Sequence, residues 1–347
     1  MNSFGQYERT RYFPQLDGLR AVSILLVLTI HSHVTQLRVL NGYIGVTVFF
    51  VLSGFLITTL LLREADLQGR VSLRNFYIRR AFRIFPLYYL VLGANIVAVA
   101  AGFADNPGDF GQRLVLFLTY LNEFASPGTF GHSWSLAIEE KFYFVWPLLA
   151  FAVPAVWRWR PWVAAALVVL CTSAGLVGGY LGTYAPIVFG CVMALAPHNP
   201  RSHRVVRLLA RPLPGAILGV VVVAVGLLSR TDSHIHLAFG AAVALVLPVL
   251  LIGPDGAHAW LRWSPLRFVG QRAYAIYLVH PLVGSVIDSV LPTDTVILTV
   301  VHLVLMFAGS LVVAHVLFIL CERPLIVVGR RLTGSRRAVE ALPSATP

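Results

Sequence analysis

Leu16-Asp-Gly-Leu-Arg-Ala-Val-Ser-Ile-Leu-Leu-Val-Leu-Thr-Ile-His31 is the stretch that decides the fold. Its apolar run belongs to a segment near 21–38 that is long enough to cross a bilayer core of about 30 Å. No small-x-small cleavage site follows the run, so we interpret it as a retained first span and not as a signal peptide. The span has ionisable residues at both ends, and these need an explanation.

The composition of the whole chain also indicates a bilayer. The 347 residues are 57% hydrophobic and 12% charged, with a mean hydropathy of +0.77, whereas soluble domains carry about 25% charged residues. This excludes a soluble globule, a disordered chain and a coiled coil. The basic residues behind the net charge of +12 are separated by long apolar runs, so we expect no nucleic-acid partner. Cys171, Cys191 and Cys321 lack the paired spacing of bridges or zinc sites and are expected to be core residues.

Ten apolar segments are long enough to span, since a crossing helix needs roughly 17 to 25 residues. A further run at 114–121 is too short, and we expect it to be re-entrant or interfacial. The sequence therefore predicts an all-α fold, a polytopic membrane bundle of ten transmembrane helices plus a short re-entrant segment. The expected spans lie near 21–38, 43–62, 85–103, 135–156, 162–178, 181–197, 213–229, 236–253, 273–291 and 295–320.

The arginines predict the orientation of this bundle. With the N-terminus in the cytoplasm, 23 of the 27 basic residues fall in cytoplasmic segments, in agreement with the positive-inside rule. We therefore expect a multi-pass protein of the inner (plasma) membrane with both termini cytoplasmic. Residues 1–330 are expected to form one membrane-embedded domain, followed by a short disordered cytoplasmic tail at 331–347.

The first group of intramembrane polar residues lies on the first span. Arg20 and His31 are eleven positions apart, about three turns, so they share nearly one face roughly 16 Å apart along the axis. Asp17 belongs to the same stripe. A titratable group in a span costs about 2.5 to 3.5 kcal/mol and needs a partner or a task. Each residue also has a structural explanation: Asp17 as a helix cap, Arg20 as a headgroup anchor and His31 as a partner of a neighbouring helix.

The second group precedes the expected third span. Arg80 and Arg83 are three apart, share a helical face and are suited to gripping phosphate oxygens. The alternative is an ordinary positive-inside anchor with interfacial aromatic residues.

The third group is His132-Ser-Trp-Ser-Leu-Ala-Ile-Glu-Glu-Lys-Phe-Tyr143, which enters the fourth span from the outside. Glu139 lies about 9 Å below the outer edge if the helix begins near Ser133, at a level roughly 5 Å from that of His31. The two side chains therefore meet if their helices are neighbours. The alternative is a structural pair between Glu139 and Lys141.

Other polar positions have simpler explanations. Ser53 and Gly54 lie in the second span, where small residues favour close helix packing. His280 precedes a proline, so a kink explains it. Histidines spaced two apart point to different faces of a helix, and we expect no metal site. These pairs are His31 with His33 and His234 with His236.

Together these segments resemble the acyltransferase-3 family, integral membrane O-acyltransferases that modify bacterial surface polysaccharides, peptidoglycan and some secondary metabolites. The similarity extends from Leu16 to Pro324 and rests on the order and spacing of six motifs. They are Leu16-Asp-Gly-Leu-Arg20 with the ten-residue gap to His31, Phe49-Phe-Val-Leu-Ser-Gly-Phe55, Arg80-Ala-Phe-Arg83, His132-Ser-Trp-Ser-Leu136 with Glu139, Ile276-Tyr-Leu-Val-His280 and Glu322-Arg-Pro324.

The resemblance implies an acyl-CoA donor reached from the cytoplasm, and an essential histidine and arginine at the positions of His31 and Arg20. We hypothesise that Arg20, Arg80 and Arg83 hold the donor phosphates, because charge-assisted phosphate contacts are strong. His31 then takes the proton from an acceptor hydroxyl as that hydroxyl attacks the thioester. Glu139 orients the imidazole or supports its charged form. The acyl group is expected to be acetyl, the family's common case.

The acceptor is expected to be a carbohydrate, a glycolipid or a small glycosylated molecule. Trp134 is assigned to it because a flat aromatic ring suits a sugar face, and His132, Ser133 and Asp17 are assigned with it. The alternative function is a transporter of a lipid-linked or small anionic substrate, in which the same polar groups bind without acyl chemistry. Transporters commonly have paired inverted halves, and the sequence shows none.

Overall fold

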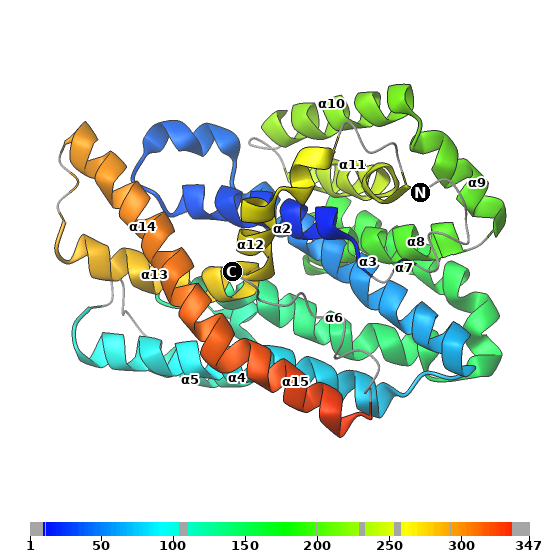
Figure 1. Ribbon diagram of the computed structural model, residues 1–347, viewed down its shortest axis with the longest axis horizontal. Helices are drawn as coiled ribbons and strands as arrows, with labels where there is room; N and C mark the ends of the chain where they lie inside the picture. The colour runs from blue at the N-terminus through cyan, green and yellow to red at the C-terminus, as the bar shows by residue number, and fades with distance from the viewer. Residues whose placement is uncertain are drawn as a thin grey trace. The chain divides into compact units, whose positions relative to one another are not determined.

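The chain folds into helices and loops (Figure 1). The computed structural model describes residues 10, 12–103, 110–125, 127–198, 200–228, 233–252, 258–291, 293 and 295–334. No strand occurs among them, so the expected all-α fold is confirmed. The α-helices are α2 (Pro14–Ile30), α3 (Tyr43–Gln68), α4 (Leu73–Ala100), α5 (Phe110–Leu118), α6 (Trp134–Phe151), α7 (Arg160–Leu176), α8 (Ala185–His198), α9 (Pro200–Leu209), α10 (Pro212–Leu228), α11 (Ser233–Ile252), α12 (Ser264–Gln271), α13 (Ala273–Asp288), α14 (Val296–Leu317) and α15 (Arg323–Leu332).

Short helical turns connect several of these helices. They are η1 (Thr35–Leu40), η2 (Asn122–Phe124), η3 (Gly131–Ser133), η4 (Pro154–Trp159), η5 (Tyr180–Tyr184), η6 (Ala259–Arg262) and the π-helical turn η7 (Phe318–Glu322).

Each expected span overlaps one α-helix. Five helices in the described part of the chain are long and apolar enough to cross a membrane, at Tyr43–Gln68, Leu73–Ala100, Trp157–Leu176, His234–Ile252 and Val296–Leu332. Three shorter apolar helices lie at Tyr180–Ala196, Pro212–Leu228 and Ala273–Asp288. The chain is therefore a multi-pass membrane protein, and the count of ten crossings stays a prediction.

The helix of the third expected span begins earlier than the sequence predicted. α4 starts at Leu73 and not near residue 85, because the hydroxyl of Ser72 accepts a hydrogen bond from the Asn75 amide at 3.3 Å and caps the helix. Arg80 and Arg83 consequently lie on α4 itself and not in a segment before it. At the other end of the chain, α15 continues to Leu332, and residues 335–347 of the expected tail lie outside the described residues.

Contacts divide the chain into two units. Unit 1 comprises Met1–Val71 and Ile138–Ala273, and unit 2 comprises Ser72–Ala137 and Tyr274–Pro347.

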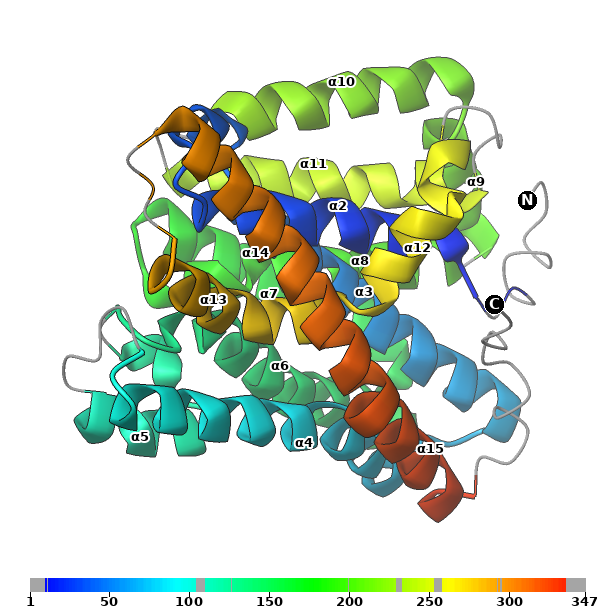
Figure 2. The ribbon, with the colours of Figure 1, turned by 60° about the vertical axis from the view of Figure 1, so that its left-hand side comes forward.

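Glycines set the distance between helices in unit 1. A Cβ atom on Gly54 of α3 would lie 1.8 Å from the carbonyl oxygen of Ile187 on α8, and one on Gly190 of α8 would lie 2.0 Å from that of Val51. Any larger residue at either position would force the two backbones apart, so the close packing expected at Gly54 is confirmed. In the same unit α10 and α11 run side by side (Figures 1 and 2).

In unit 2, the short helix α5 lies alongside α4 (Figure 2). Its 9 residues extend about 14 Å and are too few to cross a bilayer. It ends against the middle of α4, where the Tyr88 hydroxyl donates to the Phe117 carbonyl and the Tyr89 hydroxyl to the Leu118 carbonyl, both at 2.9 Å. The loop after α5 therefore starts level with the middle of α4, and the re-entrant or interfacial placement of this segment stays a prediction.

The last helices of unit 2 are continuous with one another. α14 continues through η7 into α15 (Figure 2). α15 packs on α4, where a Cβ atom on Gly329 would lie 2.8 Å from the Cβ atom of Phe82.

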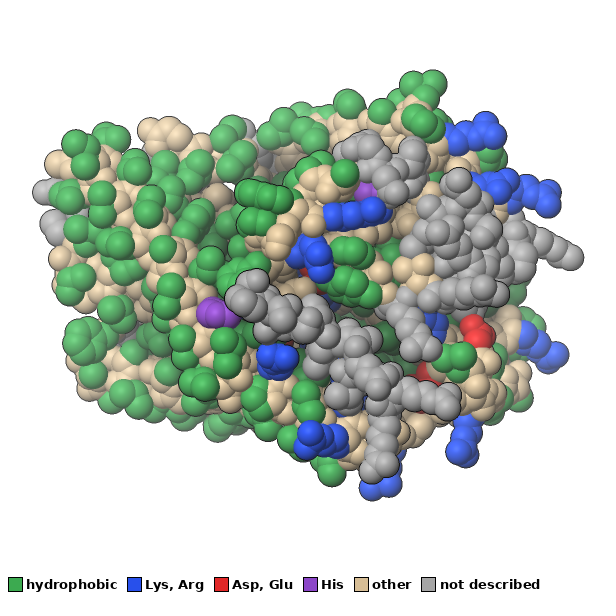
Figure 3. Space-filling view, in the orientation of Figure 1, with side chains coloured by type: hydrophobic (Ala, Val, Ile, Leu, Met, Phe, Trp, Pro, Cys, Tyr) green, Lys and Arg blue, Asp and Glu red, His purple; other side chains and the backbone are tan. Residues whose placement is uncertain are grey.

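Hydrophobic side chains cover much of the face drawn in Figure 3. Exposed large residues occur along the expected spans, including Leu60, Phe144, Val169, Val220 and Val304. Apolar surface of this extent is expected to lie against lipid.

Candidate active site

The arginine end of α2 is held by a network within unit 1. Asp17 is buried, and its Oδ1 accepts from the Arg20 guanidinium at 3.3 Å. Its Oδ2 accepts from the Tyr12 hydroxyl, and from Gln271 at 3.5 Å. Burial, and then the Asp17 carboxylate, raise the pKa of the Tyr12 hydroxyl, which keeps it a donor. Asp17 thus restrains Arg20 while the guanidinium stays partly exposed.

Two glycines position this end of α2 against η6 and α12. A Cβ atom on Gly18 would lie 2.0 Å from the carbonyl oxygen of Leu261, and one on Gly270 would lie 1.8 Å from that of Asp17. The backbones therefore touch on both sides of Asp17. The glycine in Leu16-Asp-Gly-Leu-Arg20 is required by this close approach.

The histidine end of α2 differs from expectation. The helix ends at Ile30, so the prediction of a span running on to residue 38 is wrong, and His31 is the C-cap residue. The Thr29 hydroxyl donates to the Leu26 carbonyl at 2.6 Å, and the Ser32 hydroxyl donates to the Thr29 carbonyl at 2.8 Å. Hydroxyls that bond to nearby carbonyls compete with the helical pattern and favour termination.

The His31 side chain is exposed where α2 ends. Its Nδ1 lies 3.3 Å from the Val27 carbonyl oxygen. Because a carbonyl oxygen only accepts, Nδ1 carries the proton in the neutral ring and Nε2 presents a lone pair. The imidazole is therefore in the tautomer that a general base at Nε2 needs.

α3 holds the last turns of α2 in place. A Cβ atom on Gly42 would lie 2.1 Å from the Leu26 carbonyl oxygen, and one on Gly45 would lie 2.3 Å from that of Ser23. These contacts fix the turns that carry His31.

Glu139 of α6 also lies in unit 1, half-buried. Its Oε1 accepts from the Ser53 hydroxyl of α3 at 3.0 Å and its Oε2 from the Tyr143 hydroxyl at 2.9 Å. The two hydroxyl donors hold the carboxyl group of Glu139 in one orientation. The Ser-Gly pair in the second span thus has two functions, since Ser53 bonds to Glu139 and Gly54 admits α8.

The arginines of α4 lie in unit 2. The Arg80 guanidinium lies 5.7 Å from the centroid of the Phe76 ring. Arg83, with Arg79, is close enough to Arg330 of α15 for their positive charges to interact. Arg83 is thereby grouped with Arg79 and Arg330, two residues that the sequence analysis did not select. Three guanidiniums near one another form a surface suited to a multiply charged anion.

The loop that follows α5 leads into α6 within unit 2. Its last residues are His132 and Ser133, and Trp134 is the first residue of α6. The loop is fixed from within: Asn122 donates to the Ser133 hydroxyl at 2.8 Å, and that hydroxyl donates to the Phe130 carbonyl at 2.7 Å. Arg113 of α5 is buried and donates to the Pro127 carbonyl at 3.0 Å. Non-helical backbone at membrane depth is tolerated where it is buried in protein or lines an aqueous cavity. This loop is therefore a candidate for substrate contact.

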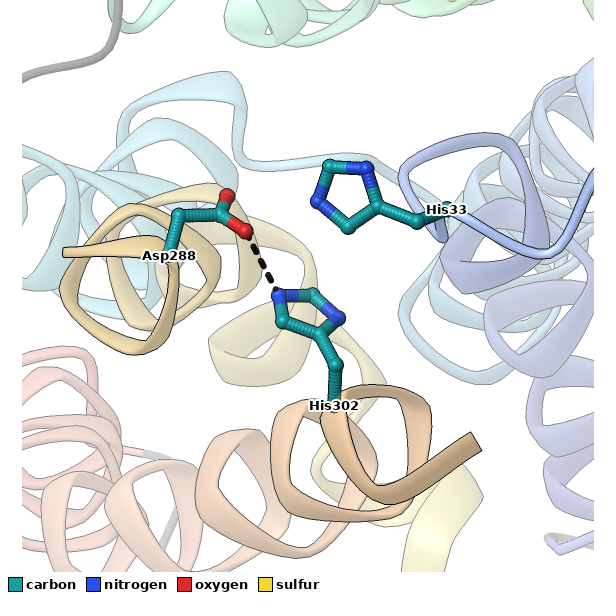
Figure 4. Close-up of side chains that lie close together, drawn as sticks. All are labelled: His33, Asp288 and His302. Carbon is teal, nitrogen blue, oxygen red and sulfur yellow. Dashed lines mark ion pairs between the residues drawn. The ribbon is translucent and has the colours of Figure 1, made fainter. Parts of the chain in front are cut away.

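The structure pairs two further residues that the sequence analysis did not select. Nε2 of His302 on α14 lies 2.9 Å from Oδ1 of Asp288 at the end of α13 (Figure 4). His302 is fully buried. The sequence contained a signal for this pair, because Asp288 and His302 are ionisable residues that lie within two apolar segments. The pair offers imidazole and carboxylate ligand atoms, and it joins α13 to α14.

A family model described as an acyltransferase domain, of the acyltransferase-3 type, matches residues 13–319. The chain belongs to this family. The acyltransferase-3 match includes both ends of α2, Glu139 and the loop before α6, and it ends before Glu322 and α15. The family resemblance seen in the sequence is thereby confirmed.

Two relatives of the chain have names that describe peptidoglycan O-acetyltransferases. YrhL of Bacillus subtilis, which has the provisional name peptidoglycan O-acetyltransferase, is 30% identical, over 92% of this chain and 56% of that protein. The peptidoglycan O-acetyltransferase OatA of Listeria monocytogenes is 27% identical, with the same coverage of 92% and 56%. The chain thus spans a little over half the length of these relatives. No solved structure matches it.

Proposed function

We propose that this chain is a membrane O-acyltransferase that moves an acetyl group from acetyl-CoA to a hydroxyl of a carbohydrate acceptor. Family membership supports acyl transfer, and the names of YrhL and OatA support a glycan acceptor of the peptidoglycan type. The observation that carries the proposal is the arrangement of α2, with a restrained guanidinium near one end and an imidazole in the base-competent tautomer at the other.

The proposed chemistry balances without a metal or redox step. Nε2 of His31 takes the proton of the acceptor hydroxyl, whose oxygen bonds to the acyl carbon. The thioester C–S bond breaks, and the imidazolium returns the proton to sulfur. Glu139, oriented by Ser53 and Tyr143, is assigned to support the transient imidazolium.

We assign the donor phosphates to Arg20, Arg80 and Arg83, and we extend this set to Arg79 and Arg330 because the charge of Arg330 interacts with those of Arg79 and Arg83. The acceptor is assigned to His132, Ser133, Trp134 and Asp17. Asp17 has a second role in this proposal, because its oxygens already hold Arg20. The arginine bias favours cytoplasmic termini. We assign the protein to the inner membrane, with residues 1–330 as the catalytic domain.

The test is consumption of [14C]acetyl-CoA by the purified chain in nanodiscs, with chitotetraose as the glycan probe. The proposal expects labelled acetyl-chitotetraose from the wild type and none from His31→Ala. His234→Ala, which removes an exposed histidine of α11, is the matched control and should retain activity. A wild type that leaves the thioester intact would favour the transporter alternative.

A further inference from the structure

Four side chains in unit 2 form a cluster, and only one of them, His132, has a role in the proposed function. His132 precedes α6, Ser135 lies on its first turn, and Tyr277 and His280 lie one turn apart on α13. The His132 ring centroid is 5.3 Å from that of His280 and 5.5 Å from that of Tyr277. The cluster brings together two motifs that are far apart in the sequence.

The direction of its hydrogen bonds follows from donor counting. The Tyr277 hydroxyl donates its one proton to the backbone carbonyl of His132. The Ser135 hydroxyl, 2.7 Å from the Tyr277 oxygen, must therefore be the donor to it. A chain from Ser135 through Tyr277 to His132 thus fixes the backbone that carries the His132 ring.

His280 is fully buried, so it cannot itself meet a substrate. Its Nδ1 lies 2.8 Å from the Tyr277 carbonyl oxygen and 3.2 Å from that of Ile276, which places its proton on Nδ1. His132 is half-buried as a residue, with its Nε2 atom buried, so part of its ring remains accessible to a ligand. His280 can therefore act through His132, whose ring it contacts.

The backbone before His132 is held in an uncommon conformation. Phe130 has φ 61°, in the left-handed region that bulky residues rarely adopt. Its ring lies 5.4 Å from that of His132 and 5.3 Å from that of Tyr88. Such strain persists only where the surroundings impose it, and it concentrates at functional sites.

We propose that Ser135, Tyr277 and His280 are positioning residues that hold the His132 imidazole against the acceptor, and so decide whether the acetyl group reaches a carbohydrate hydroxyl or water. This inference rests on the proposed function. Both outcomes form a C–O bond at the acyl carbon, break the C–S bond and return one proton to sulfur. They differ only in which hydroxyl is held in place.

The readout is the ratio of acetyl-chitotetraose to free acetate formed from [14C]acetyl-CoA. Tyr277→Phe removes the hydroxyl that bonds to His132 and should lower this ratio about tenfold, with total thioester consumption within about twofold of wild type. The matched control is Tyr274→Phe on α13, the helix that also carries Tyr277. It removes a hydroxyl that donates to the Ile84 carbonyl of α4 at 2.8 Å. It should leave the ratio unchanged.

A second pair of variants keeps the test valid if Tyr277→Phe does not fold. Ser135→Ala should lower the ratio, and Ser135→Thr, which keeps a hydroxyl, should restore it. An unchanged ratio in both Tyr277→Phe and Ser135→Ala, or an equal fall in both products, would overturn the positioning role. A wild type that consumes no thioester, or makes no acetyl-chitotetraose, would instead overturn the proposed function and this inference with it.

Discussion

His31 and His280 are held by the same local device in very different surroundings. In each, Nδ1 donates to a carbonyl about one turn earlier, that of Val27 or of Tyr277. His31 is exposed at the end of α2, whereas His280 is fully buried within α13. A fixed tautomer therefore prepares an imidazole for proton transfer, whereas access to substrate decides whether the ring does chemistry or supports a neighbour.

Replacing the two histidines should separate these roles, with the largest effect at His31. His31→Ala removes the proposed base and should lower thioester consumption by about 10² to 10⁴-fold. His280→Asn keeps a donor for the Tyr277 carbonyl, and should retain consumption while shifting product from acetyl-chitotetraose to acetate. The measurement is initial rate and product ratio in nanodiscs. Equal losses in the two variants would remove the distinction.

The next effect tests how α3 places His31. Gly45→Ala puts a methyl group 2.3 Å from the Ser23 carbonyl oxygen and must displace the end of α2. We expect transfer to fall by about 10²-fold, since a displacement of about 1 Å has effects of this size, together with a lower Tm. Gly93→Ala, where a Cβ atom meets nothing within 4 Å, is the control and should change neither. Full activity in Gly45→Ala would contradict this account of the placement of His31.

Glu139→Gln should have a smaller effect. The amide keeps the side-chain shape and an oxygen that can accept from Ser53 or Tyr143, but it cannot carry a negative charge. We expect kcat to fall about tenfold, or about 1.4 kcal/mol in activation free energy, with KM for acetyl-CoA unchanged. Ser53→Ala removes one of the two donors to Glu139, and its kcat should lie between those of the wild type and Glu139→Gln. A rise in KM with constant kcat would instead place Glu139 in substrate binding.

The smallest effect is expected at Asp17. Asp17→Asn weakens the restraint on Arg20, and a partly exposed ion pair contributes at most about 1 kcal/mol. KM for acetyl-CoA should rise no more than about fivefold, with kcat preserved. Arg20→Gln, which removes the phosphate-binding group itself, should raise KM further. An Asp17→Asn variant with lower kcat and a normal KM for acetyl-CoA would contradict the role of Asp17 in restraining Arg20 and leave only its assignment to the acceptor.

The sequence predicted the helices well because hydropathy reports where a chain enters lipid. Gly54 was also predicted correctly, since small residues in spans indicate close packing. The end of α2 was missed because it depends on the hydroxyls of Thr29 and Ser32, which an apolar run conceals. The earlier start of α4 was missed for a similar reason, a serine cap.

The candidate site was predictable where the motif residues lie close in sequence, as for Asp17 and Arg20. It was less predictable where contacts join distant segments. The bonds of Glu139 to Ser53 and of His302 to Asp288 depend on helix packing, which no local pattern records. His280 was explained by a proline kink, and only the structure shows its ring against that of His132.

The central claim is that Nε2 of His31 is the proton acceptor. The most direct test is 15N NMR of histidine-labelled protein in nanodiscs, with the His31 signals identified by their loss in His31→Ala. The account predicts a neutral ring with the proton on Nδ1 and a proton-free Nε2. A neutral ring with its proton on Nε2 would contradict it.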